Sequence, residues 1–145
     1  MAVYTLVGAE DIAAMLDNYG IGPLQSAKGI AEGVENSNYL IEAGGKRYIL
    51  TLYERRVDAH DLPFFIALID HLASSGLPVP RILADRSGTH VQSLGGRPAC
   101  LIEFLPGISV TRPTTRQAWS AGAALGKMHV ALADYPGKRT NTLGL

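Results

Sequence analysis

The 145-residue sequence contains one cysteine, Cys100, and no net charge, because 13 Lys and Arg side chains balance 13 Asp and Glu side chains. One cysteine cannot form an internal disulfide, and thiolates alone cannot build a metal site. Balanced charge argues against nucleic-acid binding, which depends on an excess of basic side chains. The apolar share of 47% argues against a disordered chain. These values predict one globular unit with a single hydrophobic core.

Long apolar runs are also missing from the sequence. No stretch approaches the roughly 18–20 consecutive apolar residues of a membrane-spanning helix. The first residues, Met1–Leu6, show neither the basic start nor the small-residue cleavage site of a signal peptide. We therefore expect no membrane contact and a cytoplasmic location.

The pattern of apolar and turn residues predicts both helices and strands. Gly44 and Gly45 separate two strand-like runs and predict a β-hairpin. Asp61 and Pro63 are typical of a helix start. The expected elements are helix 9–19, a strand between residue 24 and the loop at Lys28, hairpin strands 38–43 and 46–53, helix 61–75, strands 89–93 and 97–104, a connector over 108–115 and helix 116–133. This order indicates an α+β fold, with one antiparallel sheet and a helix packed on it.

The segment Lys28–Tyr39 is rich in glycine and small polar residues. Gly29 and Gly33 permit close approach of the backbone to a ligand, and they are followed by polar side chains at Glu35, Asn36, Ser37 and Asn38. These features suit a loop that covers phosphate groups. The segment lacks the Gly-Lys-Ser/Thr of a P-loop and the spacing of a dinucleotide-binding turn. An ordinary solvated hairpin connector therefore remains the alternative.

The other residues that could carry chemistry favour structural roles. The four histidines are scattered, with no partners at metal-ligand spacing: His60, His71, His90 and His129. Cys100 lies in an apolar strand and is expected in the core, and no G-x-S-x-G serine elbow is present. We expect Trp119, Leu125 and Met128 to be packing groups on the last helix. That helix is rich in Ala and Gly, which suits close approach by another element.

Several short motifs occur in a specific order along nearly the whole chain: Lys28–Tyr39, Tyr48–Glu54, Asp61–Phe65, Gly76–Pro80, Pro98–Gly107 and Leu125–His129. Together they resemble the N-terminal lobe of the type II homoserine kinases, within the aminoglycoside phosphotransferase and choline kinase-like superfamily. The glycine-rich segment and Asp61–Phe65 point to the homoserine kinases. Gly76–Pro80 is shared across the superfamily.

The resemblance implies a protein-kinase-like small lobe with a five-stranded antiparallel sheet, and ATP as co-substrate. Residues 1–106 would form the nucleotide-binding lobe, and residues 107–145 the connector and first helix of an incomplete C-terminal lobe. The implied nucleotide-binding residues are Gly29, Ile30, Gly33, Asn36, Ser37 and Asn38 in the loop, Thr51 on a strand, and Glu103 and Leu105 at the hinge. An ordinary core strand followed by a Pro-Gly turn is the alternative at the hinge.

Two positions depart from the superfamily pattern. Thr51 stands where many members have a Lys or Arg that meets the phosphates, and Phe65 stands near the place of the usual helix Glu. The nearby acids are Asp61 and Asp70. The phosphate charge would then be balanced by the glycine loop, by another basic group such as Lys28, or by metal ions.

The superfamily supplies its catalytic Asp and Mg²⁺ ligands through an H-x-D-x-x-x-x-N run and a later D-x-D-type segment, and this sequence contains neither. No catalytic residue or metal ligand is therefore assigned. A complete form would use Mg²⁺ and phosphorylate L-homoserine, whereas we expect these 145 residues alone to be poorly active. The alternatives are a kinase with another hydroxyl acceptor and a non-catalytic binding module, which could form a homo-oligomer or associate with a separate large lobe.

Overall fold

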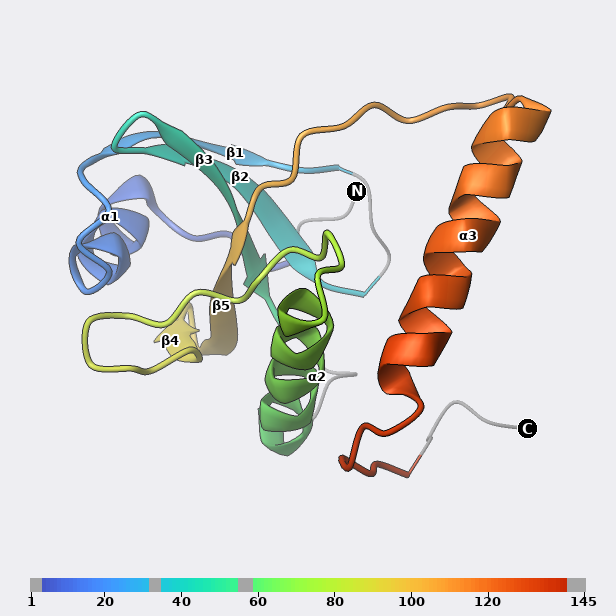
Figure 1. Cartoon of the computed structure of the whole chain (residues 1–145). Coiled ribbons are helices and arrows are strands. Elements are labelled where there is room, and N and C mark those ends of the chain that lie inside the picture. Colours follow the sequence, from blue (N-terminus) through green and yellow to red (C-terminus); the bar gives the residue numbers. More distant parts are fainter. Residues whose placement is uncertain (1–3, 32–34, 55–58, 141–145) are drawn as a thin grey trace. The chain divides into compact units, whose positions relative to one another are not determined.

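A computed structural model of the chain describes residues 4–31, 35–54 and 59–140. Five strands form one antiparallel sheet in the order β1-β2-β3-β5-β4 (Figure 1). The strands are β1 Leu24–Gly29, β2 Ser37–Ala43, β3 Lys46–Leu52, β4 Gln92–Leu94 and β5 Arg97–Glu103. The helices are α1 Ala9–Asp17, α2 Leu62–Ser74 and α3 Thr115–Leu132, and a 3₁₀ turn spans Ala59–Asp61. The predicted α+β class with a five-stranded antiparallel sheet is confirmed.

The β2–β3 hairpin is the most regular pair of the sheet. Its strands pair without interruption from Ser37 with Leu52 to Ala43 with Lys46. The predicted turn residues, Gly44 and Gly45, have φ values of 55° and 74°, a left-handed conformation that is costly for other residues. A Cβ on Gly44 would also collide with the carbonyl oxygen of Ile21. The predicted hairpin is confirmed, and its turn requires glycine for both conformation and space.

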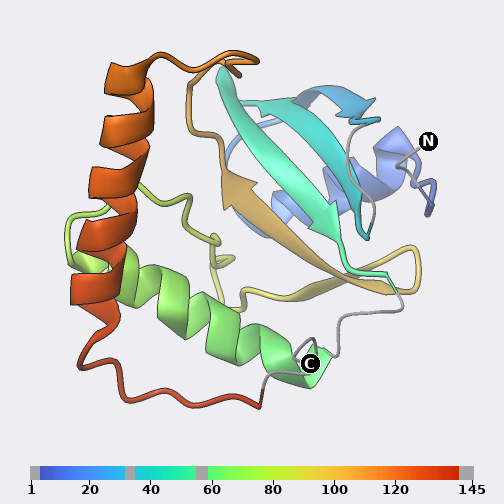
Figure 2. The same ribbon diagram turned by 90° about the vertical axis from the view of Figure 1, so that its right-hand side faces the viewer.

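The hydrophobic core lies between α1 and one face of the sheet (Figure 1 and Figure 2). Helix α1 directs Ile12, Met15 and Leu16 into this core, at the spacing of one helix face. The strands contribute side chains with no exposed surface: Ile41, Leu50, Leu52 and Leu101. The helix ends at Asp17, before the predicted end at Tyr19, and Tyr19 enters the core from the turn that follows.

The segment before α1 is held against the sheet by a buried hydroxyl. Ser37 has no exposed surface, and its Oγ accepts hydrogen bonds from the backbone N–H groups of Tyr4 and Thr5 at 2.8 and 3.0 Å. The same hydroxyl donates to Glu54 Oε1 at 2.7 Å. The other carboxylate oxygen of Glu54 lies 3.2 Å from Arg97 Nε. The network thus joins the N-terminal segment, β2, β5 and the residues that follow β3.

Glu54 is a nearly buried carboxylate, with 11% of its side chain exposed. Burial by itself raises the pKa of Glu54, but hydrogen bonds from Ser37 and Thr5 and the charge of Arg97 outweigh burial and hold the pKa below its usual value. Glu54 is therefore ionised at neutral pH, and its negative charge is part of the folded structure.

The expected strand over residues 89–93 is wrong at its start, because β4 begins at Gln92. Residues before it form a turn around the Asp85 carboxylate. Asp85 Oδ1 accepts hydrogen bonds from Ser87 Oγ at 2.7 Å, Ser87 N at 2.8 Å and Thr89 N at 2.9 Å. These bonds, with that from the Ser87 hydroxyl the strongest cause, lower the pKa of Asp85 to about 2. Backbone donors used inside the turn cannot pair with a neighbouring strand.

The chain divides into two compact units. The sheet unit comprises residues up to Leu62 together with Arg81–Phe104, and the helical unit comprises Pro63–Pro80 and the residues from Leu105 onward. The expected division into lobes after residue 106 stays a prediction. None of the described helices has the length and apolar character needed to span a bilayer.

Within the helical unit, α2 and α3 are joined near their C-terminal ends (Figure 2). His71 Nε2 donates to the carbonyl oxygen of Ala131 at 2.6 Å, and the Tyr135 ring lies 5.0 Å from the His71 ring. His71 has the structural role that the sequence predicted for it.

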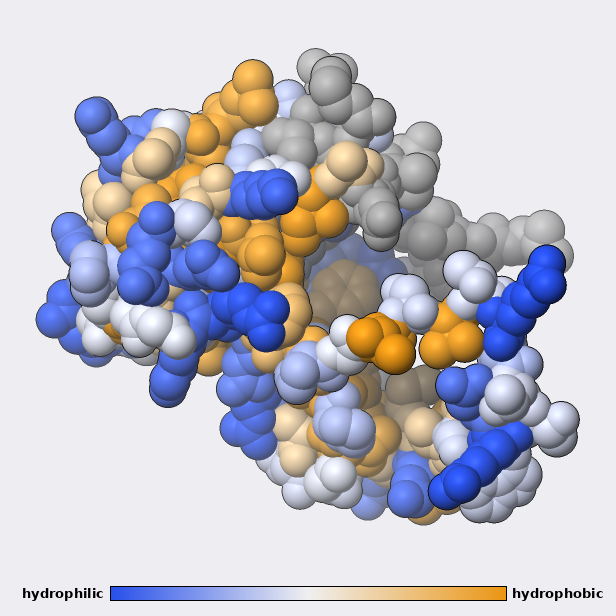
Figure 3. All heavy atoms as spheres, turned by 90° about the horizontal axis from the view of Figure 1, so that it is seen from above, coloured by the Kyte–Doolittle hydropathy of each residue, from blue (hydrophilic) through white to orange (hydrophobic). Residues whose placement is uncertain are grey.

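Helix α3 begins at a capping box formed by Thr114 and Gln117, yet it has no buried residue. Trp119 and Leu125 are 74% and 50% exposed, and Met128 is half-buried. The expectation that Trp119 and Leu125 are packing groups is therefore wrong for the described chain. Figure 3 shows, in orange, apolar residues that reach the surface on one face of the chain.

Replacing Gly44 by alanine is expected to destabilise the fold more than Gly45→Ala. Both changes place a side chain at positive φ, at a cost of about 1–2 kcal/mol. Only a Cβ at Gly44 meets another backbone atom, whereas nothing lies within 4 Å of a Cβ at Gly45. We expect Gly44→Ala to lower the free energy of unfolding, measured in urea, by about 2 kcal/mol more than Gly45→Ala. Equal losses would contradict the close approach at Ile21.

The change Ser37→Ala is expected to lower the free energy of unfolding by about 3 kcal/mol, because two backbone donors and Glu54 lose a buried partner. Ser26→Ala is the matched control. Ser26 is exposed and its hydroxyl donates to Glu42, so its removal should cost less than about 0.5 kcal/mol. Similar losses for the two variants would rule out Ser37 as the anchor of the N-terminal segment.

Stability in acid should depend on Glu54. Its folded pKa lies below its usual value, so it stabilises the fold above that value and loses this effect as pH falls through the folded pKa. The unfolding free energy of the wild type should therefore fall more steeply between about pH 6 and pH 3 than that of Glu54→Gln. Asp85 titrates in both proteins, so the difference between the curves isolates Glu54. Parallel curves would show that the carboxylate has no preferential interaction in the folded state.

Candidate functional site

The face of the sheet opposite the core, called here the second face, carries side chains in cross-strand rows. Alternation along β2 and β3 directs every second residue to this face. The paired residues form three rows: Asn38 with Thr51 and Cys100; Lys28 with Leu40, Ile49 and Ile102; and Ser26 with Glu42 and Arg47. The first row lies at the end of the sheet where the glycine-rich segment joins β1 to β2.

The described part of the glycine-rich segment is closed at its base by hydrogen bonds. Gly29 pairs with Tyr39, and Ile30 N donates to the carbonyl oxygen of Asn38 at 2.8 Å. The Ile30 amide is therefore used within the sheet. Gly33 lies outside the described residues.

Asn36 and Asn38 connect this base to β3 and to the residues after it. Asn36 Oδ1 accepts a hydrogen bond from Glu54 N at 3.4 Å. Asn38 Oδ1 accepts one from Thr51 Oγ1 at 2.7 Å, which leaves the amide NH₂ of Asn38 as a donor group. These residues place neutral hydrogen-bond donors, suited to phosphate oxygens, at one end of the second face.

Among the described residues, Thr51 and Ser37 are buried polar side chains, with 7% and 0% of their surface exposed. Thr51 points to the second face, whereas Ser37 points to the core face and all contacts of its hydroxyl are made within the protein. The structure thus brings Gly29, Ile30, Asn36, Asn38 and Thr51 together, with Ser37 behind them as an anchor.

Of the other two predicted residues, Glu103 lies at the opposite end of β3 and β5 from Thr51. Glu103 is the last residue of β5 and pairs with Tyr48. Its N–H donates to the carbonyl oxygen of Arg81 at 2.9 Å, and its Oε2 accepts from Arg81 N at 3.1 Å. Leu105, which follows in the helical unit, is 44% exposed.

Cys100 occupies the row of Thr51 but is inert at neutral pH. It has no exposed surface, and burial raises the pKa of its thiol to about 11 despite a hydrogen bond with Tyr53 that lowers it. Burial likewise raises the pKa of Tyr53. The predicted burial of Cys100 is confirmed, and the residue lies on the face of the sheet opposite the core around α1.

Two features near these residues were not found from the sequence. Glu54 links Asn36 through its backbone and Ser37 through its side chain. Arg47 lies with its guanidinium carbon 4.3 Å from the centre of the Phe104 ring. A carboxylate directly after an apolar strand was the available signal for Glu54, but its partners are distant in sequence and only the fold identifies them.

Residues 4–31, 35–54 and 59–140 contain no group of three or more His, Cys, Asp or Glu side chains that could hold a metal ion.

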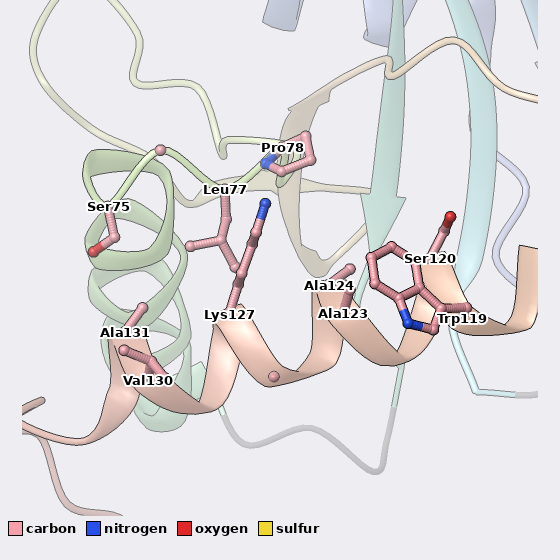
Figure 4. Close-up of a pocket in the computed structure, with 12 residues that line it drawn as sticks. Ser75, Leu77, Pro78, Trp119, Ser120, Ala123, Ala124, Lys127, Val130 and Ala131 are labelled. Atoms are coloured by element: carbon pink, nitrogen blue, oxygen red, sulfur yellow. The ribbon is translucent and has the colours of Figure 1, made fainter. Parts of the chain in front are cut away.

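A groove of about 960 Å³ lies within the helical unit, between the residues that follow α2 and the side of α3 (Figure 4). Its lining is mainly apolar, with Leu77 and Pro78 on one side and Trp119 on the other, and Lys127 extends across it. None of the predicted site residues lines this groove.

Curated relatives match the whole chain. The homoserine kinase of Zymomonas mobilis subsp. mobilis is 53% identical over 100% of this chain and 46% of its own length. The homoserine kinase of Xanthobacter autotrophicus is 50% identical over 100% of this chain and 45% of its own length. The chain thus spans under half the length of these relatives.

Solved structures with this fold are more distant in sequence. Spectinomycin phosphotransferase APH(9)-Ia, solved in complex with ADP and spectinomycin, matches 84% of this chain and 37% of its own, with a TM-score of 0.67 and 20% identity. The microcompartment-associated aminopropanol kinase matches 95% of this chain and 44% of its own, with a TM-score of 0.62 and 18% identity. These likenesses establish the kinase-like fold.

A family comparison covers the glycine-rich segment, most of the sheet and the later helices. Residues 26–143 match the phosphotransferase enzyme family. Because this match extends over most of the sequence, the chain belongs to the phosphotransferase enzyme family.

Proposed function

We propose that this chain is the nucleotide-binding part of a homoserine kinase, which transfers the γ-phosphate of ATP to the side-chain hydroxyl of L-homoserine on the route to threonine. The observation that carries the proposal is an identity of 53% and 50% to two homoserine kinases along the whole chain. The ADP in a structure of the same fold supports a nucleotide as co-substrate.

On this proposal ATP lies against the second face of the sheet. The phosphates would lie near the glycine-rich segment and the Asn38–Thr51 pair, where the amide NH₂ group of Asn38 can donate hydrogen bonds to phosphate oxygens. Backbone groups beside Glu103 would meet the adenine edge, and the exposed Leu105 would contact the ring. The proposed nucleotide-binding residues are Gly29, Ile30, Gly33, Asn36, Ser37, Asn38, Thr51, Glu103 and Leu105, with Ser37 acting through the position of its neighbours.

The chemistry of transfer requires more than these residues. A carboxylate must orient and deprotonate the acceptor hydroxyl, and cations must stabilise the transferring phosphoryl group. The sequence has no H-x-D-x-x-x-x-N run, and the described residues include no metal-binding group of three. They therefore do not fit Mg²⁺ on their own. The chain would bind and orient the nucleotide, and the acceptor site and metal ligands would belong to other residues of a complete enzyme.

Residues 1–106 would act as the nucleotide-binding lobe, and residues 107–145 would connect it to the lobe that carries catalysis. That lobe could continue the same chain or be a separate chain, and a homo-oligomer is a further form. Cytoplasmic location is part of the same proposal, since amino-acid biosynthesis from ATP takes place there.

A chimera tests the proposed activity. We would join this chain to the part of the Zymomonas mobilis homoserine kinase that lies beyond the 46% matched here, and measure ADP release with L-homoserine and MgATP. The chimera should be active, whereas the 145-residue chain alone should be at least about a hundredfold less active, because it lacks the acid–base residue.

The relative itself is the control for the chimera. A folded chimera that is inactive, beside an active relative, would contradict the assignment of this chain as the nucleotide-binding part of a homoserine kinase. Comparable activity of the 145-residue chain alone would contradict the assignment of catalysis to other residues.

A further inference from the structure

We propose that Lys28 supplies the positive charge that holds the ATP phosphates in this protein. Thr51 is uncharged, so the positive charge on the second face would come from Lys28 instead. The inference rests on the proposed function, because it assumes that the second face binds ATP. It names the side chain that gives this site its affinity for phosphate.

The phosphate end of the proposed site lacks a free cation among Thr51, Asn38 and Ile30. Thr51 is neutral, nearly buried, and already donates its hydroxyl to Asn38 at 2.7 Å. The Ile30 amide donates to the carbonyl oxygen of Asn38, so it is also engaged. ATP carries several negative charges, and the chain has no net positive charge that could attract them. A cationic side chain on this face would supply the missing attraction.

Several cationic side chains of the sheet unit are already engaged within the protein. Three of the arginines have partners in the structure. Arg97 pairs with Glu54, Arg86 donates to backbone carbonyl groups at the end of α1, and Arg47 lies over the Phe104 ring. Arg47 lies opposite Glu42 in the strand register, at the end of the sheet away from Thr51.

Lys28 differs from these arginines. It is exposed on β1, and no ion pair of its ammonium group is found in the part of the chain that the structure describes. It directly precedes Gly29, at the start of the glycine-rich segment. It is therefore a free cation at the edge of the proposed phosphate site.

The register of the sheet directs Lys28 to the correct face. Lys28 pairs with Leu40, and Leu40 pairs with Ile49. Ile49 is two residues from Thr51 on β3, so all these side chains share the second face. With strands about 4.8 Å apart and a rise of about 3.3 Å per residue, the Cα atoms of Lys28 and Thr51 are roughly 12 Å apart.

An extended lysine side chain covers about half of that separation, since its four-carbon stem places the ammonium group roughly 6 Å from Cα. The other half of the separation leaves room for a phosphate group between the Lys28 ammonium group and the Asn38–Thr51 pair. The charge would come from β1 in place of the usual β3 position, at the same end of the same face.

Lys46 offers a matched control. It is also an exposed lysine, but it pairs with Ala43 beside the hairpin turn, at the other end of β3. It is five residues from Thr51, or about 16 Å along the strand. Lys46→Met therefore makes the same change in net charge and hydrophobicity without touching the proposed phosphate site.

The experiment measures the dissociation constants of ATP, ADP and adenosine for the 145-residue chain and for Lys28→Met, Lys28→Arg and Lys46→Met by titration calorimetry. Lys28→Met should weaken ATP and ADP binding about tenfold or more, the effect of losing a charged hydrogen bond, and change adenosine binding less than about twofold. Lys28→Arg should restore most of the loss, and Lys46→Met should resemble the wild type.

The outcomes separate the two proposals. If the wild type binds ATP no better than adenosine, the proposed phosphate site is absent and both proposals fail. If the wild type prefers ATP and Lys28→Met keeps that preference, only the assignment of Lys28 is overturned. Equal losses of ATP and adenosine in Lys28→Met would show that the lysine stem supports the base or the fold, and would also overturn the assignment.

Discussion

The register of β2 against β3 is the constraint on which the core and the candidate site both depend. Because side chains alternate, one register sends Tyr39 and Ile41 to α1 and sends Asn38 and Leu40 to the second face. A slip by one residue would bury Asn38 in the core and expose the apolar set. The Gly44–Gly45 turn excludes that slip, since its left-handed conformation and its contact with Ile21 suit a two-residue connection. The register that forms the core therefore also places the residues of the candidate site.

Two buried hydroxyl groups connect the paired strands to the residues around the glycine-rich segment. Ser37 faces the core and satisfies the backbone of the N-terminal segment, while Thr51 faces the other side and bonds Asn38. Each hydroxyl would be costly to bury without a partner. Since Ser37 and Asn38 are adjacent, the position of Asn38 is fixed from both faces of the sheet. Glu54 adds a third attachment through its N–H group and Asn36.

Local signals in the sequence were sufficient for most of the fold. The glycine pair predicted the hairpin, helical spacing predicted α1, and strand-like runs predicted the five strands. Interactions between distant residues were not predictable in this way. Ser37 was expected to meet nucleotide, and its side chain instead bonds the backbone of Tyr4, 33 residues away. The turn around Asp85 shortened β4 because a carboxylate competed for backbone donors.

The sequence predicted which segment forms the candidate site, but not how its side chains are directed. Glycine and polar composition identified the segment that joins β1 to β2, and the fold then brought Gly29, Asn36 and Asn38 to the Thr51 end of β3. Composition could not tell which polar residue faces which side, because that depends on the register. Trp119 shows the same limit. Its apolar character predicted burial, but burial depends on a covering element, which the described chain does not place over it.

Three carboxylates of the sheet unit are engaged by hydrogen bonds within the fold. Glu54 is neutralised by Arg97 and hydrogen-bonded by Ser37, Asp85 is held by its own turn, and Glu103 bonds the backbone of Arg81. A general base needs a carboxylate that is free to accept a proton from substrate near neutral pH. The pKa values of Glu54 and Asp85 are instead lowered by structural hydrogen bonds, which makes both groups weaker bases. The hydrogen bonds that stabilise this sheet therefore make Glu54 and Asp85 poor candidates for proton transfer.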